Sequence, residues 1–479
     1  MPEKNKLPVQ AGKTYEVEIH SLGSMGEGVG RYEDFAVFVP GALPGEKARV
    51  LIEETKKTYA KGRIQELLRE SGDRVAPVCP VYERCGGCQL QHLDYMAQLR
   101  GKRQQVIDAM TRIGKRPDLY VEPVLGAASP WNYRNKVQFP VGKKKGKTII
   151  GCFARGSHEI INTEDCHIQK EGNNKVINAV REIVTALHIP VYDEDRHSGV
   201  LRHVVSRVGE KGDLMVTLVT ATGKLPREKE FVKLLREKLP KLVSIQHNIQ
   251  TYRNNVILGR DTHLLWGKPT ILDRIGRLLF HISPRSFFQV HTAQAEILYG
   301  KALEYAGLSG EEIVIDAYCG TGTITLFLAQ KARKVYGIEV VKPAILDARK
   351  NARENHVRNA EFIVGDAAQV MPGLYRQGVR ADVVVVDPPR AGCAPAVLKA
   401  FADMKPRRMV YVSCNPASLA RDVEILDGLG YRAVKAQPVD MFPQTSSIEC
   451  VVKLVPKGAG NREEKVAGQV KKGQGGYQR

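Results

Sequence analysis

Cys414 is the residue whose place in the chain points most directly to chemistry. It lies in Ser413-Cys414-Asn415-Pro416, directly after the apolar run 409–412. Proline is favoured in the first turn of a helix, so we expect the cysteine where a buried strand gives way to a helix. Most lone cysteines are small buried residues. A thiol at such a turn, however, can ionise and attack carbon. We therefore predict that Cys414 is a nucleophile.

Acidic residues stand at the ends of four successive apolar runs upstream of this cysteine: Asp316, Glu339, Asp366 and Asp387. The runs alternate with helical stretches, which is typical of βαβ units in a doubly wound parallel sheet. Strand ends of such a sheet meet at one crevice, so we expect the four carboxylates to converge. Any one alone could instead cap a helix. Four acids would repel a polyphosphate, which favours a sulfonium nucleoside as ligand.

A glycine-containing turn follows the first of these runs, in Asp316-Ala-Tyr-Cys-Gly320-Thr-Gly322. Glycines let the backbone turn sharply and approach a ligand closely. Thr325 stands where a dinucleotide fingerprint has its third glycine, so a nicotinamide oxidoreductase fits poorly. Glu339 is placed to bind ribose hydroxyls and Asp366 to accept from an adenine amino group.

Cysteines are also concentrated near the N-terminal side of the chain. The pattern Cys-x5-Cys-x2-Cys, with one more distant residue, could hold a metal through Cys79, Cys85, Cys88 and Cys166. Cys152 is the rival fourth ligand. Gly86-Gly87 inside the group removes side chains that would crowd a bulky cluster. By spacing alone, tetrahedral zinc and a 4Fe–4S cube fit equally well.

The composition favours an anionic partner. The chain has 479 residues, with 72 Lys and Arg against 52 Asp and Glu, for a net charge of +20. Nucleic acid is the default partner for such a surface. The sequence has no long apolar span and no apolar leader, so we predict a cytoplasmic protein without a membrane partner. In that reducing compartment the nine cysteines favour metal or catalytic roles over disulfides.

Four segments follow from the patterning. Short strands and a glycine-rich loop at 23–30 predict a small β-barrel over residues 8–68. A mixed α+β domain with the cysteines is expected over 75–280, and the doubly wound α/β domain over 285–455. Residues 456–479 are basic and glycine-rich, so we expect a disordered tail.

These motifs together make the chain similar to the RNA 5-methyluridine methyltransferases, a class I S-adenosylmethionine-dependent family. The resemblance includes Ser286-Phe-Phe-Gln289, Asp387-Pro-Pro-Arg390 and Glu449. It implies an N-terminal TRAM-like barrel, a central iron–sulfur domain and a C-terminal Rossmann-like methyltransferase sheet. The implied reaction methylates C5 of uridine through a bond from Cys414 to C6. Glu449 then removes the C5 proton.

The resemblance also assigns the other ligands. It implies S-adenosylmethionine binding by Gln289, Tyr318, Glu339 and Asp387, to which the pattern adds Asp316, Gly320 and Asp366. It favours a 4Fe–4S cluster on Cys79, Cys85, Cys88 and Cys166. Two positions depart from the family pattern, because Ser447 replaces a histidine and His291 replaces an asparagine.

The substrate implied first is 23S ribosomal RNA, because family members with this cysteine group and barrel mostly act on it. No obligate protein partner is inferred. Transfer RNA is the alternative within the class, and cytosine-5 methylation is a chemical alternative. A non-catalytic iron–sulfur protein that binds or folds RNA is the alternative from another class.

Overall fold

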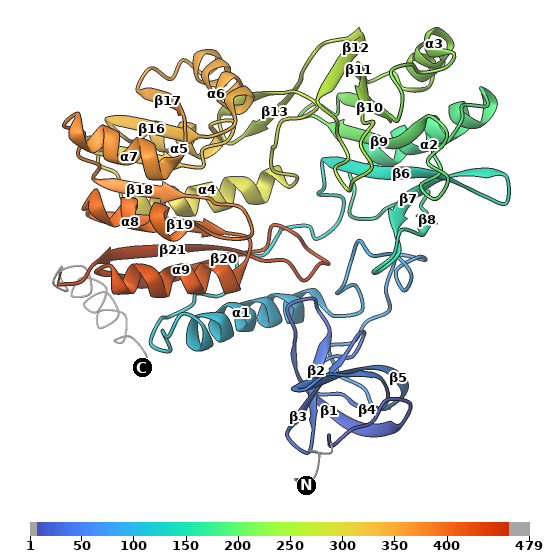
Figure 1. The fold of residues 1–479 in the computed structure, drawn as a ribbon, viewed down its shortest axis with the longest axis horizontal. Coiled ribbons are helices and arrows are strands. Elements are labelled where there is room, and N and C mark those ends of the chain that lie inside the picture. The colour runs from blue at the N-terminus through green and yellow to red at the C-terminus, as the bar shows by residue number, and fades with distance from the viewer. Residues whose placement is uncertain (1–6, 459–479) are drawn as a thin grey trace, which may run out of the picture.

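The computed structural model describes residues 7–458, so the tail expected over 456–479 lies outside this range from residue 459 onward. Its first residue, Pro456, is the end of strand β21 (Glu449–Pro456). Figure 1 shows three bodies: a barrel at the N-terminus, a central sheet, and an α/β domain formed by the C-terminal part of the chain. Within the described residues, no helix is long and apolar enough to cross a membrane.

The N-terminal body is a closed five-stranded barrel with strand order β1-β2-β3-β5-β4. The strands are β1 (Thr14–Leu22), β2 (Gly28–Tyr32), β3 (Phe35–Val39), β4 (Lys47–Thr55) and β5 (Tyr59–Arg69). Alternate residues such as Val17, Ile19, Val37 and Val50 fill the interior, as the period of a strand requires. Part of the glycine-rich loop expected at 23–30 is therefore strand β2.

The central body is a seven-stranded sheet with order β12-β11-β10-β9-β6-β7-β8. Helices α2 (Glu171–Ala186) and α3 (Glu228–Lys238) share its apolar core. The strands are β6 (Lys136–Lys144), β7 (Lys147–Phe153), β8 (Ile160–Asn162), β9 (Leu201–Val208), β10 (Leu214–Thr220), β11 (Leu242–Ile249) and β12 (Asp261–Gly267). The cysteine-containing segment leads into this sheet from the barrel.

The C-terminal body is a seven-stranded, mostly parallel sheet with order β17-β16-β15-β18-β19-β21-β20. Its strands are β15 (Ile313–Ala317), β16 (Lys334–Glu339), β17 (Ala360–Val364), β18 (Val383–Val386), β19 (Arg408–Ser413), β20 (Tyr431–Val439) and β21 (Glu449–Pro456). The four valines of β18 are all buried, as expected for a strand covered on both faces. This confirms the predicted doubly wound α/β sheet.

Helices cover both faces of this sheet. One face packs against α4 (Thr292–Ala306), α5 (Thr323–Ala329), α6 (Lys342–Glu354) and the hairpin β13 (Ile271–Ile275)–β14 (Leu278–Ile282). The other packs against α7 (Ala367–Arg376), α8 (Pro395–Asp403) and α9 (Pro416–Gly428). Successive residues of β15 serve opposite faces, with Val314 in the first core and Ile315 in the second.

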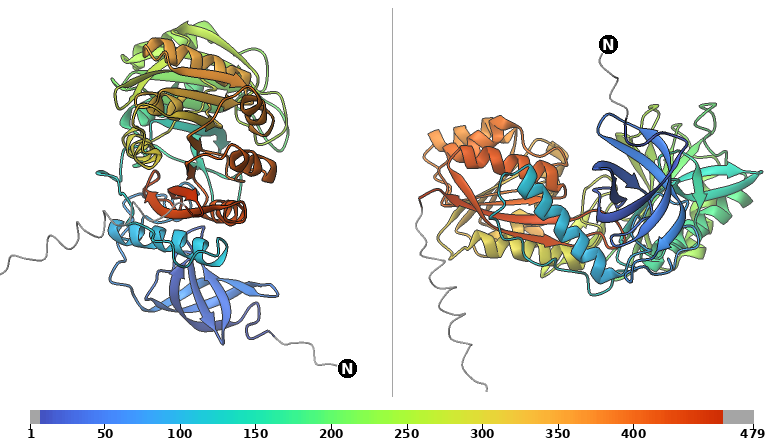
Figure 2. Two further views of the ribbon diagram at one scale, coloured as in Figure 1. Left: turned by 90° about the vertical axis from the view of Figure 1, so that its left-hand side faces the viewer. Right: turned by 90° about the horizontal axis from the view of Figure 1, so that it is seen from below.

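Helix α1 (Tyr95–Arg112) lies against the C-terminal body although it precedes the central sheet in the chain. Its Val106 and Met110 belong to the core that contains α8 and α9. In the view from below, α1 crosses beneath β20 and β21 and ends beside the barrel (Figure 2). The helix therefore connects the cysteine segment directly to the last strands of the C-terminal sheet.

The tight closure of the barrel gives a test of its packing. A methyl group added at Gly30 would lie 2.4 Å from Val17 Cγ1 and 2.5 Å from the carbonyl oxygen of Glu18. We expect Gly30→Ala to destabilise the barrel by about 1–3 kcal/mol, because the backbone oxygen has no room to move away. Hydrogen exchange of the strand amides measures this loss. Gly72→Ala is the matched control, since nothing lies within 4 Å of its added methyl, and equal protection in both variants would contradict the prediction.

Candidate active site at the strand ends

The turn after β15 is built for close approach of a ligand. Gly320 and Gly322 have φ of 54° and 83°, in the left-handed region that glycine adopts without strain. Tyr318 has φ of 66°, a conformation that costs a non-glycine residue free energy and is concentrated at functional sites. A methyl group at Gly322 would lie 3.0 Å from the ring of Phe362, so the turn packs tightly against that ring.

Asp316 lies fully buried at the end of β15. The Thr325 hydroxyl donates to its Oδ2 at 2.5 Å, while Oδ1 is buried without a hydrogen-bond partner. Burial is the main cause that raises the pKa of Asp316 to about 7, and Asp387 and Glu339 add to it. Thr325 was expected only to exclude a dinucleotide fingerprint, but it orients this carboxyl group. The unpartnered oxygen is available to a donor from a ligand or water.

Glu339 and Asp366 end the next two strands and hold local backbone. Glu339 accepts from the backbone N–H groups of Gly320 at 3.3 Å and Val341 at 2.9 Å, so it braces the glycine turn. Asp366 is exposed and is the N-cap of α7, where it accepts from the N–H of Ala368 at 2.8 Å. Asp366 therefore caps a helix, as the alternative interpretation of this residue proposed. Its contact with adenine stays a prediction.

The Cys414 turn is tied to the loop after β18. Asn415 caps α9 by accepting from the N–H of Ala417 at 3.1 Å, and its Nδ2 donates to the carbonyl of Arg390 at 3.0 Å. Ser418 Oγ donates to the same carbonyl at 3.0 Å. These contacts hold the thiol beside Asp387-Pro388-Pro389-Arg390, and Cys414 itself is only half-buried.

Strand β21 brings Glu449 to the same place. It runs antiparallel to β19, and the last pair is Ser413 with Cys450. Cys414 follows this pair on one strand and Glu449 precedes it on the other, and the charge of Glu449 acts on the Cys414 thiol. The Glu449 side chain is buried, and burial followed by the charge of Asp387 raises its pKa well above the usual range. A raised pKa makes the ionised carboxylate a stronger base, which suits a group that must remove a proton from carbon.

Electrostatics at Cys414 oppose its ionisation. Burial is the largest cause that raises the pKa of the thiol, and Glu449 and Asp387 raise it further, while Arg390 lowers it. The arginine thus favours the thiolate but does not outweigh the other causes. Bound ligands must therefore offset the charge of Glu449 and Asp387, or donate to the sulfur, before the thiolate dominates.

Gln289 and Tyr299 are buried next to Asp387 and Glu449. Gln289 is 5% exposed, and its backbone carbonyl accepts from Nδ2 of Asn135 at 3.0 Å. Tyr299 is 2% exposed on α4, with its hydroxyl 3.4 Å from Thr323 Oγ1. Burial raises its pKa, and Asp387 and Glu449 contribute, which locates its ring beside the two acids. No sequence pattern pointed to Tyr299, because Leu298-Tyr299 has the pattern of an ordinary core helix.

His291 and Ser447, the two departures from the family pattern, make different kinds of contact. His291 stacks on Tyr133 with ring centroids 4.5 Å apart, and Nδ1 lies 3.2 Å from the carbonyl oxygen of Met441. Burial lowers its pKa to about 4, so it serves as a neutral packing residue. Ser447 donates its backbone N–H to Thr445 Oγ1 at 3.3 Å in the loop before Glu449.

The predicted metal ligands share one cavity. Its walls include Cys79, Cys85, Cys88, Cys166 and also Cys152. The thiols of Cys85 and Cys152 are hydrogen-bonded, which lowers the pKa of Cys85. A methyl group at Gly87 would lie 3.4 Å from Cys85 Sγ and 3.6 Å from Cys152 Sγ, as expected for a glycine that keeps this space open. Across residues 7–458, however, no three His, Cys, Asp or Glu side chains are arranged to hold a metal ion.

Arg390 offers a direct test of the charge balance at the thiol. We expect Arg390→Gln to raise the pKa of Cys414 and to slow its alkylation by iodoacetamide at pH 8 by about two- to fivefold, a fraction of a pKa unit. Mass spectrometry of the peptide that contains residue 414 measures the rate. Arg432→Gln, at an exposed position of β20, is the control. An unchanged rate in the Arg390 variant would contradict the assigned charge effect.

Comparison with known proteins agrees with this geometry over almost the whole chain. A family described as tRNA (Uracil-5-)-methyltransferase matches residues 94–457, and the TRAM domain matches residues 8–64. An uncharacterized RNA methyltransferase of Clostridium tetani is 49% identical over 95% of this chain and 99% of its own length. One from Halalkalibacterium halodurans is 50% identical over 94% of this chain and 99% of its own length.

A solved structure is similar in fold as well as sequence. It is the Pyrococcus abyssi tRNA (uracil-54, C5)-methyltransferase in complex with S-adenosyl-L-homocysteine. It shares 30% identity and a TM-score of 0.73, over 92% of this chain and 100% of that chain.

Proposed function

The chain belongs to the tRNA (uracil-5-)-methyltransferase family, and from this premise we propose that it transfers a methyl group from S-adenosylmethionine to C5 of a uridine in 23S ribosomal RNA. RNA methyltransferase activity follows from family membership. The choice of cofactor is supported by the relative with bound S-adenosylhomocysteine and by the donor set at the strand ends. The unpartnered Oδ1 of Asp316, the braced glycine turn and Glu339 suit a ligand with hydroxyl and amino donors.

The observation that carries the proposed mechanism is the closeness of Cys414 and Glu449, which flank the last backbone pair of β19 and β21 and interact electrostatically. The Cys414 thiolate adds to C6 of uracil, which makes C5 a nucleophile. S-adenosylmethionine, when bound, supplies the electrophilic methyl group that C5 takes. Glu449 then removes the C5 proton, the C5–C6 double bond re-forms, and the bonding pair of C6–S returns to sulfur.

The remaining residues are proposed to orient the reactants. Gln289, Tyr318, Glu339 and Asp387 would contact the methyl donor or the base, with Gly320 and Asp366 at the edge of the site. Asp387 and Glu449 share a buried region beside Cys414, so a cationic donor there would relieve their repulsion. Tyr299 adds a buried hydroxyl to the same region.

The RNA choice rests on charge and on the family resemblance. The net charge of +20 supplies the electrostatic part of polyanion binding. The barrel and the cysteine-lined cavity are the features associated with ribosomal substrates in this family. A transfer RNA is the second candidate, favoured by the named substrate of the Pyrococcus abyssi relative. The target base must be flipped out or already unpaired to reach Cys414.

Substrate and mechanism are tested together in cells that lack this protein. We expect the parent protein to restore 5-methyluridine in 23S ribosomal RNA, while Cys414→Ala restores none, because no adduct can form. Mass spectrometry of digested ribosomal and transfer RNA measures both. Arg432→Gln is the control, since this exposed residue of β20 belongs to no part of the proposed site. Methylation confined to transfer RNA would select the second candidate, and methylation by the Cys414 variant would refute the covalent step.

We also propose that Cys79, Cys85, Cys88 and Cys166 hold a 4Fe–4S cluster that orders the segment before α1. The shared cavity and the space kept open at Gly87 support this. A cube spreads its ligands over four irons, so its thiols stand farther apart than those of a single-ion site. The cluster has no role in the methyl transfer, and the adjacent Cys152 is the alternative fourth ligand.

Metal analysis tests this assignment. We expect about four irons per chain after anaerobic purification, and Cys88→Ser to lose most of them, because one corner of the cube is removed. Inductively coupled plasma mass spectrometry counts the metal, and Cys319→Ser is the control outside the cavity. One zinc per chain, or no metal at all, would contradict the cluster. Retention of iron by Cys166→Ser but not by Cys152→Ser would assign the fourth ligand to Cys152.

A further inference from the structure

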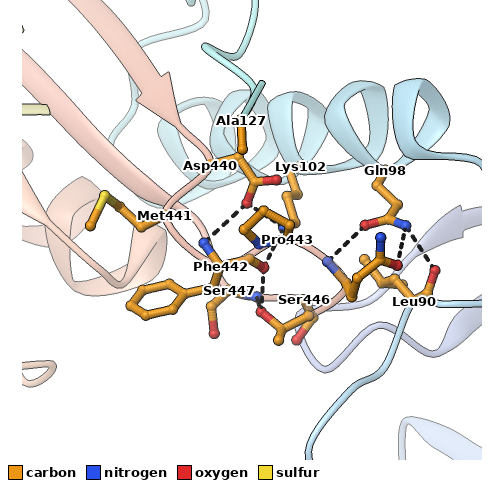
Figure 3. Close-up of polar contacts among 12 residues, drawn as sticks. Leu90, Gln98, Lys102, Ala127, Asp440, Met441, Phe442, Pro443, Ser446 and Ser447 are labelled. Carbon is orange, nitrogen blue, oxygen red and sulfur yellow. Dashed lines mark hydrogen bonds and ion pairs between the residues drawn. The ribbon is translucent and has the colours of Figure 1, made fainter. Parts of the chain in front are cut away.

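Residues 440–448 form a loop that joins β20 to β21, and this 440–448 loop ends at Glu449. Val439 and Glu449 are paired across the two strands. The loop therefore begins just after the partner of the proposed catalytic base and ends just before the base itself. Figure 3 shows Gln98 and Lys102 of α1, and Leu90 just after the cysteines, lying against this loop. A further contact comes from Tyr133 at the entry to the central sheet. The position of Glu449 therefore depends on segments far away in the sequence.

Lys102 of α1 makes the most buried of these contacts. Its Nζ donates to Asp440 Oδ1 at 2.7 Å and to the carbonyl of Phe442 at 3.1 Å, and both charged side chains are 0% exposed. Tyr95, also on α1, donates its hydroxyl to Asp440 Oδ2 at 3.0 Å. A single buried cation thus fixes the first residue of the loop and a backbone carbonyl two residues later.

Gln98, one helical turn before Lys102, holds the middle of the loop. Its Oε1 accepts from the N–H of Gln444 at 3.1 Å, and its Nε2 lies 3.0 Å from Gln444 Oε1. The Gln444 carbonyl accepts from the backbone N–H groups of Gln89 at 3.1 Å and Leu90 at 3.0 Å. Gln444 has φ of 69°, a strained conformation that persists only where surrounding contacts hold it.

The two anchors are i and i+4 on one helix, so they present a single rigid face to the loop. Tyr133 adds a third point by donating its hydroxyl to the carbonyl of Pro443 at 3.0 Å. A hairpin loop of this length held at several points has little freedom to shift the strand residue that follows it. Loss of the buried anchors would free the loop, and Glu449 is its next residue.

We propose that Lys102 and Gln98 are positioning residues for Glu449, acting through the 440–448 loop to hold its carboxyl group where it removes the C5 proton. The inference rests on the proposed function of Glu449. Neither α1 residue touches substrate. Their effect falls on the last step alone, in which the C5 proton passes to Glu449 and the C6–S bond breaks, because Cys414 and the glycine turn are held by other contacts.

The test is accumulation of the covalent intermediate on ordinary, unfluorinated RNA. The variant is Lys102→Met with Asp440→Asn, because removal of the lysine alone would leave a buried charge without a partner. We expect its adduct to decay about 10- to 100-fold more slowly than that of the parent, as for a misplaced catalytic group. The rate of adduct formation and the affinity for RNA should stay unchanged. Quenched samples on denaturing gels measure the adduct, and filter binding measures affinity.

Three further variants separate the outcomes. Arg100→Met, on an exposed face of α1 where it pairs with Asp73, is the control and should decay at the parent rate. Gln98→Met tests the second anchor and should also accumulate adduct, even where the double variant fails to fold. Parent-like decay in either folded anchor variant would refute the positioning role. Failure of Glu449→Gln to accumulate adduct would instead refute the proposed role of Glu449.

Discussion

Strand β21 enters the sheet antiparallel between β19 and β20, and this placement fixes which side chain faces Cys414. In a purely parallel sheet the neighbour of β19 would present its own carboxyl end beside the thiol. Here the neighbour presents its first residue instead, because β21 runs the other way. Cys414 leaves β19 as Glu449 enters β21, so one ladder of backbone hydrogen bonds sets the distance between them. The other parts of the site are arranged around this pair.

Burial decides the chemistry of the groups gathered there. The carboxyl groups of Asp316, Asp387 and Glu449 all have raised pKa values, and in each case burial is the largest cause. Water would favour the ionised forms, so the protein keeps these acids closer to neutrality than they would be in solution. Asp316 and Asp387, whose pKa values are raised to about 7, can take and release a proton near neutral pH. The same burial holds Cys414 as a thiol until substrate arrives.

Some of the site was predictable because short-range patterns specify it. Apolar runs followed by acids locate the strand ends, and Pro416 marks the start of α9, so Asp316, Glu339, Asp387 and Cys414 were brought to one edge as expected. The doubly wound sheet and the barrel followed from the same periodicity. The sequence left two roles open for Asp366, and the backbone around it shows that it caps α7.

Contacts between residues far apart in the sequence could not be predicted from any local pattern. The buried Lys102 lies on α1, whose polar residues suggest a solvated helix, and its partner Asp440 is more than three hundred residues away in the sequence. Tyr299 is indistinguishable from a core residue until Asp387 and Glu449 are placed beside it. Cys152 lies in an ordinary strand, yet its thiol contacts Cys85. In each case the partner comes from a separate element, and no local spacing connects the two.

The central claim, a covalent bond from Cys414 to the pyrimidine ring, is tested most directly by peptide mapping after reaction with RNA that carries 5-fluorouridine. Fluorine cannot leave as a proton does, so the adduct should persist through digestion. We expect a single modified peptide, with the nucleotide on residue 414 and the transferred methyl group on its C5. A nucleotide on another cysteine, or methylated RNA without any protein adduct, would contradict it.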